Sequence, residues 1–237
     1  LSAIRRQLPE VRREDALHVL AELLAAAVRP FRAIHHLREA KVLNLAASSP
    51  QDYAAEVRNK FGTEIKQVSR DRMLEVYNSI PDKDAKDEAV RWTSGATAVV
   101  EPSQDEIFRS CKLGLAFQKL LDAEDATVLT VDCYGSMYRK LPAFPCIGFT
   151  RLNDMGLGGV CQSDLPCVMM HILFQGLTGR PGFVCNPTFD YSSNGVVLIH
   201  CLGTRRMDGP DRPAAPYKLR DVMERQEGAV AQVRMRV

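Results

Sequence analysis

The second half of the chain carries several polar residues of the types that do chemistry at the ends of strands. Gln162 and Asp164 lie together in a polar loop. Asn186 ends one short apolar run and His200 lies near the end of the next. Amide oxygens, a carboxylate and an imidazole can hold a cation or a hydroxylated ligand. Because α/β scaffolds place such side chains at the ends of consecutive elements, we expect a functional site here.

A helix is expected directly after the polar loop. Ser163 and Asp164 are a good helix start, because their side chains can accept from free amides of the first turn. Gly179, followed by arginine and proline, is a typical stop. The apolar residues between these ends recur at helical spacing: Leu165, Val168, Met169, Ile172, Leu173 and Leu177.

Two short strands are expected after this helix. Residues 182–185 are predicted to form a buried strand that ends at Asn186 and Pro187, because proline cannot extend the ladder. A polar turn over residues 191–195 follows, and the apolar run 196–201 is predicted to be the second strand.

These segments resemble a known family in four places. Its motifs are Glu-x-Asp, an apolar helix ending in Leu-Thr-Gly/Asn, a strand ending in Asp, and a later strand ending in His-Cys. The chain resembles the carboxyl-terminal half of the L-fucose and L-arabinose isomerase superfamily. The corresponding residues here are Gln162-Ser163-Asp164, Leu177-Thr178-Gly179, Phe183-Val184-Cys185-Asn186 and Ile199-His200-Cys201.

The resemblance implies an aldose-ketose isomerase. In such enzymes a divalent metal, usually manganese, polarises the substrate oxygens while two acids move a proton between neighbouring carbons. Carried over to this sequence, the metal ligands are Gln162, Asn186 and His200, and the catalytic residues are Gln162, Asn186 and Asp164. The resemblance also implies a small sugar as substrate, a pentose or deoxyhexose, and a homo-oligomer, a trimer or hexamer.

The chain departs from the family pattern at two ligands. Gln162 and Asn186 stand where the family has glutamate and aspartate. A carboxamide brings no negative charge to a hard cation and cannot accept a proton near neutral pH. Three functions stay open: a sugar isomerase that holds metal through His200 and amide oxygens, a catalytically silent sugar-binding or scaffold homologue, and another carbohydrate enzyme that uses Asp164 or Asp190 as base.

Each of these residues also has a purely structural interpretation. A lone histidine on an apolar strand is often a core residue, so His200 could be buried without binding anything. Gln162 and Asn186 could be turn and cap residues. Inside the apolar helix, His171 is expected to be packed core. Asp154, Asp190 and His171, like Asp164, stay open as substitutes for the two missing acids. The glycines of residues 156–159 either turn the chain or permit close backbone approach.

Composition describes an ordinary globular protein. The chain has 237 residues, 46% of them hydrophobic and 25% charged, which is enough to bury a core of one large or two small domains. A net charge of +2 is too small to attract nucleic acid or an anionic membrane, so we expect neither as a partner. No apolar run reaches the length of a membrane span.

All seven cysteines lie between Cys111 and Cys201. An odd number without tight paired spacing argues against a disulfide framework and against a zinc knuckle. We therefore predict reduced thiols in a cytoplasmic protein. Cys161 and Cys167 flank the polar loop, where either could be reactive or simply a small buried hydrophobe.

The fold is predicted to be α/β, with a parallel doubly wound sheet followed by an α+β domain that holds a partial antiparallel β-barrel. Residues 1–40 are expected to be a helical segment, 41–131 the sheet domain, and 132–237 an isomerase-like domain. Pro30 is expected to separate two helices in the first segment, and His35 and His36 to be on the surface.

Strands and helices are expected to alternate within residues 41–131. Ser103 and Glu106 form a capping box before one of the helices. Asp132, which follows the last strand, could face the pocket or cap a turn. The expected strands are 42–46, 64–68, 97–100 and 126–131; the expected helices start at 51, 69, 81 and 104.

The turns after these strands contain neither a Gly-rich phosphate cradle nor a P-loop lysine, so we expect no nucleotide cofactor. Beyond residue 203, a loop over residues 204–216 contains Arg205 and Arg206, which we interpret as surface residues. Strands are then expected at 217–224 and 229–237. Because the chain ends inside a strand-like pattern, we interpret it as a fragment.

Overall fold

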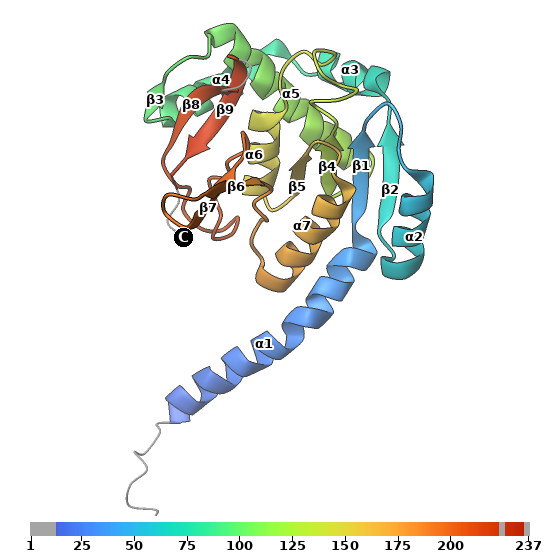
Figure 1. Ribbon diagram of the computed structural model, residues 1–237, viewed down its shortest axis with the longest axis vertical. Helices are drawn as coiled ribbons and strands as arrows, with labels where there is room; N and C mark the ends of the chain where they lie inside the picture. Colours follow the sequence, from blue (N-terminus) through green and yellow to red (C-terminus); the bar gives the residue numbers. More distant parts are fainter. Residues whose placement is uncertain (1–12, 223–225, 235–237) are drawn as a thin grey trace, which may run out of the picture.

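A computed structural model describes residues 13–222 and 226–234, and Figure 1 shows their arrangement around a central sheet. All four strands of this sheet are parallel, in the order β2-β1-β4-β5. The strands are β1 (Lys41–Leu45), β2 (Glu64–Val68), β4 (Val128–Val131) and β5 (Gly158–Cys161). The sheet confirms the expectation of a parallel α/β fold.

Helices cover both faces of the sheet. Alternate residues of β1 point to opposite sides, so Val42 packs in one apolar layer and Leu43 in the other. Residues of α2 (Gln51–Phe61) and α7 (Leu165–Thr178) complete the first layer. Residues of α3 (Arg70–Asn78), α5 (Gln104–Ala123) and α6 (Cys146–Asp154) complete the second. The sheet is therefore doubly wound, as predicted.

Local capping signals place several helix ends where the sequence predicts them. The Ser69 side chain accepts from the Arg72 amide at the start of α3. At the start of α5, Ser103 and Glu106 form the predicted capping box. Gly179, at φ 72°, ends α7 in the left-handed conformation. These contacts satisfy amides and carbonyls that a helix end leaves free.

The expectation of two N-terminal helices is wrong. A single helix, α1 (Arg13–Glu39), runs through Pro30. Pro30 is exposed, so water can satisfy the carbonyl that loses its amide partner there, and the helix continues. The later part of α1 packs on α7, where Gly176 lies against Ala33, and the earlier part projects away from the sheet (Figure 1). His35 and His36 are exposed, as predicted.

Helix α6 and strand β5 have no counterpart among the elements predicted from the sequence. α6 and β5 pack tightly because Gly159 has no side chain: a Cβ there would lie 2.6 Å from Cα of Phe149. Asn153 of α6 accepts from the Gly159 amide and donates to the Gly159 carbonyl, at 2.8 and 3.1 Å. Gly159 therefore permits close backbone approach, whereas Gly156, at φ 81°, lies in the turn after α6.

A second, mixed sheet lies beside the first. Its order is β3-β8-β9, formed by β3 (Ala98–Val99), β8 (Tyr217–Val222) and β9 (Glu227–Val233). The strand expected at 97–100 therefore belongs to this sheet and not to the parallel one, which is a correction. Strands near 217 and 229 are confirmed up to residue 233; residues 223–225 and 235–237 lie outside the described part.

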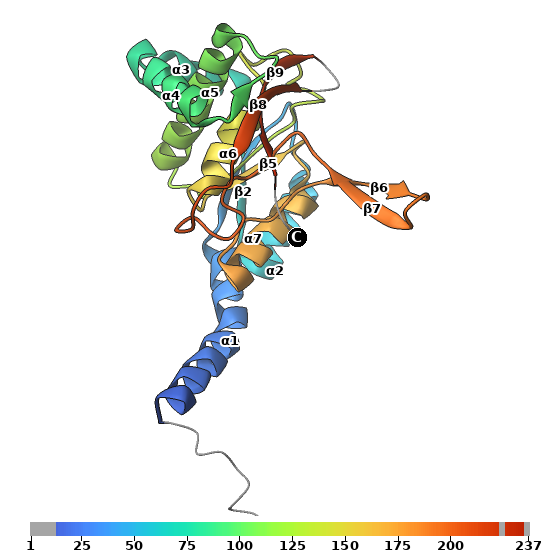
Figure 2. The same ribbon diagram turned by 90° about the vertical axis from the view of Figure 1, so that its left-hand side faces the viewer.

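The third sheet is a hairpin of β6 (Asn186–Asp190) and β7 (Gly195–Ile199), which projects from the body in Figure 2. The expectation of a buried strand over 182–185 that ends at Asn186 is wrong, because the strand begins there. A two-stranded hairpin has free outer edges, so Pro187 is tolerated opposite Leu198. His200 and Cys201 follow β7 rather than belonging to it.

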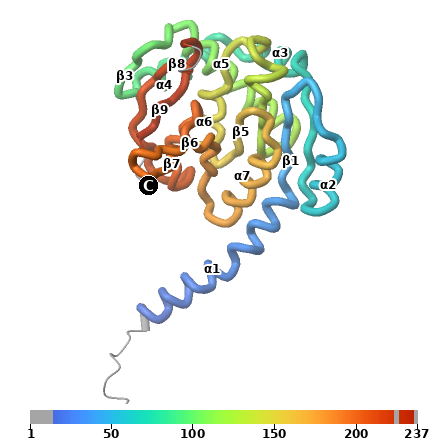
Figure 3. Tube along the Cα trace, viewed as in Figure 1, coloured from blue at the N-terminus to red at the C-terminus, as the bar shows by residue number. Residues whose placement is uncertain are grey.

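The expected antiparallel barrel does not form among the described residues, whose strands fall into three separate sheets. β5 and α7 come from the part of the chain after residue 131, yet they complete the parallel sheet and its cover. Figure 3 lets the reader follow this return of the chain to the sheet. Within the described ranges, no helix is both long and apolar enough to cross a bilayer. The division into domains stays a prediction.

α4 (Asp82–Gly95) joins the two larger sheets. Trp92 of this helix packs edge-on against Tyr217 of β8, and the Tyr217 hydroxyl donates to the Trp92 carbonyl over 2.7 Å. Glu88, one turn earlier, accepts from the indole nitrogen and from Arg151 of α6. Through Trp92 and Glu88, α4 thus connects β8 of the second sheet to α6, which covers the parallel sheet.

Candidate functional site

The candidate site lies where β4 and β5 end. Val131 pairs with Cys161 in the parallel register, so the residues after each strand emerge at the same edge of the sheet. Cys133 follows β4, and Gln162 follows β5. The carboxyl edge of a parallel sheet is the usual place for a ligand in an open α/β fold. His200 reaches this edge from the segment after the hairpin.

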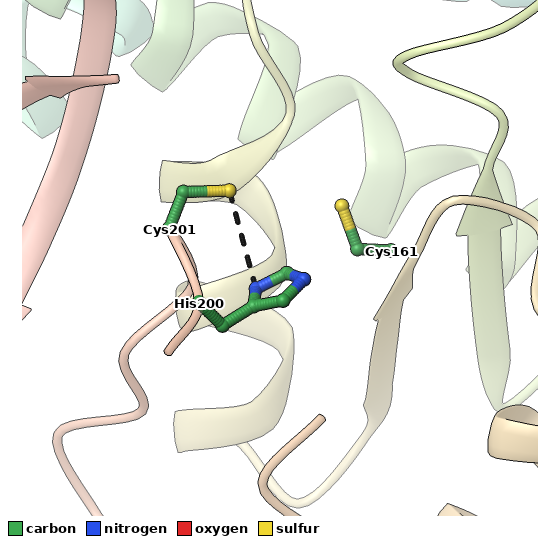
Figure 4. Close-up of side chains that lie close together, drawn as sticks. All are labelled: Cys161, His200 and Cys201. Atoms are coloured by element: carbon green, nitrogen blue, oxygen red, sulfur yellow. Dashed lines mark hydrogen bonds between the residues drawn. The ribbon is translucent and has the colours of Figure 1, made fainter. Parts of the chain in front are cut away.

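A cluster of sulfur and nitrogen atoms forms at this edge. The ligand atoms of Cys161, His200 and Cys201 all lie within 4.8 Å of one another, and Figure 4 shows the imidazole between the two thiols. Cys201 Sγ is 3.9 Å from Nδ1 of His200. We call these three residues, together with Cys133 and Cys146, the thiol cluster.

Two further thiols complete the thiol cluster. Cys133 Sγ lies 3.1 Å from Cys161 Sγ, and Cys146 Sγ lies 3.6 Å from Cys201 Sγ. Cys133, Cys146 and Cys161 are buried, and Cys201 is half-buried. All four are free thiols. The cluster therefore joins the ends of β4 and β5, the start of α6 and the segment after β7.

The backbone holds the imidazole in place. The Leu202 amide donates to Nδ1 of His200 over 3.1 Å. In Figure 4 the other ring nitrogen faces Cys161. Leu202 itself is buried in the main core, which anchors the segment that carries His200. The histidine is half-buried, so one side of the site is open to solvent.

Hydrogen bonds among the thiols divide them into donors and acceptors. Hydrogen bonds donated by Cys146 and Cys161 lower the pKa of Cys201. The neighbouring His200 lowers it further, and burial opposes the change. Donation from Cys161 likewise lowers the pKa of Cys133. The pKa values of Cys161 and Cys146 are raised, because each donates its proton. Cys133 and Cys201 are thus the sulfurs that most readily lose a proton.

The three residues predicted to hold metal occupy neighbouring segments. Gln162 is exposed at φ 65°, directly after Cys161. Asn186 is exposed and pairs with Ile199, the residue before His200. His200 belongs to the thiol cluster. The meeting of all three side chains at one point stays a prediction.

Asp164 has a structural role in the described fold. Its Oδ1 accepts from the Cys167 amide over 3.0 Å and caps the start of α7. The side chain is exposed at the same edge of the sheet. The predicted catalytic use of Asp164 stays a prediction, and the cap gives a sufficient physical reason for an aspartate here.

The remaining acids and histidine considered as substitutes have other roles. Asp190 accepts from Ser192 and Ser193 at the tip of the hairpin, which lowers its pKa to about 2. Asp132 accepts from the Ser136 amide, as expected of a turn residue. His171 is only 2% exposed, and burial lowers its pKa to about 4, which confirms the packed-core prediction.

Arg205 and Asp154 form a largely buried ion pair at the carboxyl end of α6. Asp154 Oδ1 also accepts from the backbone amides of Arg205 and Arg206. Burial raises the pKa of Asp154, and the Arg205 charge opposes that rise. The interpretation of these arginines as surface residues is wrong, because both are half-buried against this carboxylate or the neighbouring loop.

The described residues do not fit the manganese that the resemblance implies. Manganese prefers carboxylate, carbonyl and water oxygens. The group around His200 contributes thiols, and among the described residues no carboxylate joins it. Gln162 and Asn186 are exposed amides that add no charge. We therefore assign no chemical step to manganese.

A cavity of about 250 Å³ opens next to the thiol cluster. Cys133 lines it, so the cavity and the cluster share a wall. Two arginines and two glutamates also line it: Arg109, Arg139, Glu106 and Glu227. Ligand pockets are typically some 300–1,000 Å³, so this one suits a small polar molecule.

Sequence reasoning missed the thiol cluster because its members are far apart in the chain. The odd number of cysteines argues against a disulfide framework and a zinc knuckle, and it gives no indication that four of them lie together. One signal was available: Cys133 and Cys161 each stand at the end of a strand, and Cys201 adjoins His200. Those are the positions at which the sequence analysis placed the candidate ligands.

Comparison with known proteins gives one weak similarity. No family model matches the chain. It is 21% identical over 198 residues to a sulfoquinovose isomerase from Clostridium sp. (strain MSTE9). The chain is similar to a sugar isomerase. This match supports a relationship to sugar isomerases in general, and it does not single out the L-fucose and L-arabinose isomerases.

The match covers unequal shares of the two proteins. It includes 79% of this chain and 42% of the sulfoquinovose isomerase. The chain therefore spans less than half the length of its relative, and the activity of a whole isomerase comes to it only as a proposal.

Proposed function

We propose that this chain is part of a sugar isomerase-like protein and takes part in aldose-ketose interconversion of a free sugar. The observation that carries the proposal is the meeting of His200 with the carboxyl edge of β4 and β5, beside the small polar cavity. Its similarity to a sugar isomerase supports the same class of reaction. The substrate is a pentose, a deoxyhexose or a related six-carbon sugar.

The isomerisation moves a proton between two neighbouring carbons of the sugar. Such a step needs a group that accepts a proton within hydrogen-bond reach of the reacting carbon. The amides of Gln162 and Asn186 cannot do so, and we assign them to holding sugar hydroxyls. We assign the His200 imidazole, which the Leu202 amide orients toward the cluster, to positioning the sugar at this edge. We assign proton transfer to a carboxylate of the adjoining cavity, Glu106 or Glu227.

A second candidate is a catalytically silent sugar-binding homologue. It is favoured by the two neutral side chains, Gln162 and Asn186, at the positions where the resembled family has acids. In this case the protein keeps the edge of the sheet as a binding surface and has no turnover. The two candidates differ in what the wild-type chain does to a bound sugar.

The test measures ketose formation from a panel of pentoses, deoxyhexoses and sulfoquinovose. The wild type is compared with His200→Ala and with the double variant Gln162→Glu, Asn186→Asp. The matched control is Gln51→Glu with Asn59→Asp, two exposed amides of α2 that add the same charge away from the site. Isothermal titration with each sugar measures binding in parallel.

The outcomes separate the candidates. Turnover by the wild type that His200→Ala abolishes supports the isomerase. Turnover confined to the Gln162→Glu, Asn186→Asp variant, with sugar binding by the wild type, supports the silent homologue. A wild type that neither converts nor binds any sugar of the panel overturns both.

A further inference from the structure

The donor atoms around His200 have a chemistry of their own. Sulfur and imidazole ligands come from Cys161, Cys201 and His200, with ligand atoms within 4.8 Å of one another. These three residues come from two segments that meet only through the fold. Sulfur ligands are soft, and they select zinc and similar cations over magnesium, calcium and manganese.

The spacing of the atoms suits a single tetrahedral cation. Zinc binds sulfur at about 2.3 Å and histidine nitrogen at about 2.0–2.1 Å, so its ligand atoms lie roughly 3.5–4 Å apart. The ligand atoms of the three residues lie within 4.8 Å of one another, so small side-chain movements bring them to this spacing. Binding through Nδ1 of His200 would replace the hydrogen bond from the Leu202 amide. The side-chain arrangement in Figure 4 leaves the imidazole between the two sulfurs.

We propose that Cys161, Cys201 and His200 bind a thiophilic divalent cation of the zinc class. Two thiols and one imidazole make three protein ligands, which is the composition of zinc sites that keep a fourth position for water or substrate. The three ligands lie at the carboxyl edge of the sheet, where the neighbouring cavity shares Cys133 with the cluster.

Cys133 and Cys146 complete the surroundings of the cation. Their sulfurs lie 3.1 and 3.6 Å from Cys161 and Cys201, respectively. A thiol at this distance can donate a hydrogen bond to a coordinated sulfur and hold it in place. Partners of this kind orient the ligands of metal sites, and their loss typically weakens metal affinity roughly 10- to 100-fold.

The competing use of these thiols is a disulfide. The sulfurs of Cys133 and Cys161 are close enough to form a disulfide with small movements when an oxidant such as a peroxide is present. A disulfide would remove Cys161 from the metal site. The test therefore uses protein prepared under reducing conditions, and the mass of the intact chain is measured before metal is added.

The experiment is a titration of the reduced chain with cobalt(II) alone, followed by zinc(II). Cobalt in a tetrahedral site with sulfur ligands gives a sulfur-to-metal charge-transfer band in the near ultraviolet and intense bands in the visible. We expect both for the wild type at one cobalt per chain, and we expect zinc to displace them. Cys161→Ser and Cys201→Ser should weaken binding by roughly 100-fold or more, and Cys133→Ala by roughly 10- to 100-fold.

The control variants are Cys167→Ser and Cys111→Ser. Both cysteines lie outside the cluster, one half-buried in α7 and the other buried in α5. Each should keep the full cobalt spectrum. Circular dichroism of every variant shows whether loss of binding reflects loss of folding. Cys201→His, which replaces the sulfur ligand with an imidazole nitrogen, should retain a visible band at an altered position.

Several results would overturn the proposal. One is a wild type that gives only the weak spectrum of octahedral cobalt. Another is equal loss of binding in Cys167→Ser and Cys161→Ser. A third is a disulfide between cluster cysteines that the intact mass still shows after preparation under reducing conditions. The metal site and the proposed function can fail separately. A chain that binds cobalt but converts no sugar would support the metal site and contradict the isomerase.

Discussion

Arg205 Nε donates to Asp154 Oδ2 over 2.6 Å, and the Arg205 guanidinium carbon lies 4.1 Å from the centre of the Trp92 ring. The Asp154 side chain is 5% exposed and that of Arg205 23%. The pair joins the end of α6 to the segment after the hairpin, the same segment that carries His200. It thereby helps to position one wall of the candidate site.

Asp154→Ala should lower the free energy of unfolding by about 3–5 kcal/mol. The substitution leaves the Arg205 charge buried without its partner, which is the costly way to break an ion pair. Urea unfolding followed by circular dichroism measures the change. Asp208→Ala is the control: Asp208 and Arg180 lie 3.5 Å apart with side chains 75% and 58% exposed, so its loss should be within about 0.5 kcal/mol. Equal effects of the two substitutions would contradict this account.

Gly159→Ala should destabilise the chain by about 2 kcal/mol or more. The added methyl group would lie 2.6 Å from Cα of Phe149, a backbone atom that cannot turn away. The Asn153 bonds to the Gly159 backbone would be stretched as α6 moved off β5. The midpoint of urea unfolding checks the prediction.

Gly195→Ala is the matched control for Gly159→Ala. Its Cβ would meet only the Ser193 hydroxyl, at 3.0 Å, which can rotate away. Gly195 begins β7 in the exposed hairpin, so the expected change is below about 1 kcal/mol. A larger loss at Gly195 than at Gly159 would show that the contact between α6 and β5 is not the constraint.

His171 should make stability fall as the pH decreases from about 6.5 to about 4. The folded state holds the imidazole neutral, with its pKa lowered from 6.5 to about 4 by burial. Below pH 6.5 the unfolded chain binds a proton that the folded chain does not, so the free energy of unfolding decreases until the folded pKa is reached. A shift of this size corresponds to about 3 kcal/mol.

The check is urea unfolding at a series of pH values between 4 and 7. His171→Leu should flatten the curve in this window, and His35→Leu, at an exposed position on α1, should leave it unchanged. If the wild-type curve shows no more dependence on pH than the His171→Leu variant, another group controls acid stability.

The sequence predicts the elements whose ends carry local signals. Ser69 and Ser103 start their helices because their hydroxyls accept amides three residues later, and a short window of sequence contains both partners. The strand over residues 64–68 is also predicted to the residue, because it lies between a helix that ends at Gly62 and a helix that Ser69 caps. Such elements need no knowledge of distant parts of the chain.

The errors lie where distant residues decide the structure. Gly158 and Gly159 look like a turn, and they form a strand only because Phe149 and Asn153 pack across them. The sequence of residues 98–99 is equally suited to a strand of the parallel sheet and to a strand of the mixed sheet. Its partner β8 lies more than 100 residues away in the chain. Propensity alone cannot choose between these environments.

The predicted site residues and the thiol cluster occupy the same edge of the sheet, and the sequence indicates only the former. Sequence motifs pointed to Gln162 and His200, which do lie at neighbouring positions of the carboxyl edge. The sulfurs that dominate this edge come from four separate segments, and only the fold brings Cys133 to Cys161 and Cys146 to Cys201. A motif within one segment could not contain that information.

The projecting part of α1 carries an apolar stripe that the described fold leaves uncovered. Leu17, Leu20, Leu24, Val28 and Phe31 share one face and are each more than half exposed. Ala33, which packs on α7, lies on the opposite face of the helix. The spacing of 17, 20, 24 and 31 is that of a coiled-coil seam. We propose that a second copy of the chain covers this stripe.

Self-association through α1 should therefore be measurable by light scattering coupled to size exclusion. A lone helix with an apolar stripe gains its stability from packing, so we expect the wild type to be oligomeric. Leu20→Glu with Leu24→Glu should shift it to the monomer and lower its helical content. Arg29→Glu changes the net charge by the same amount on another face of α1 and should keep the oligomer. A monomeric wild type, or dissociation by Arg29→Glu alone, would rule out this seam as the contact between copies.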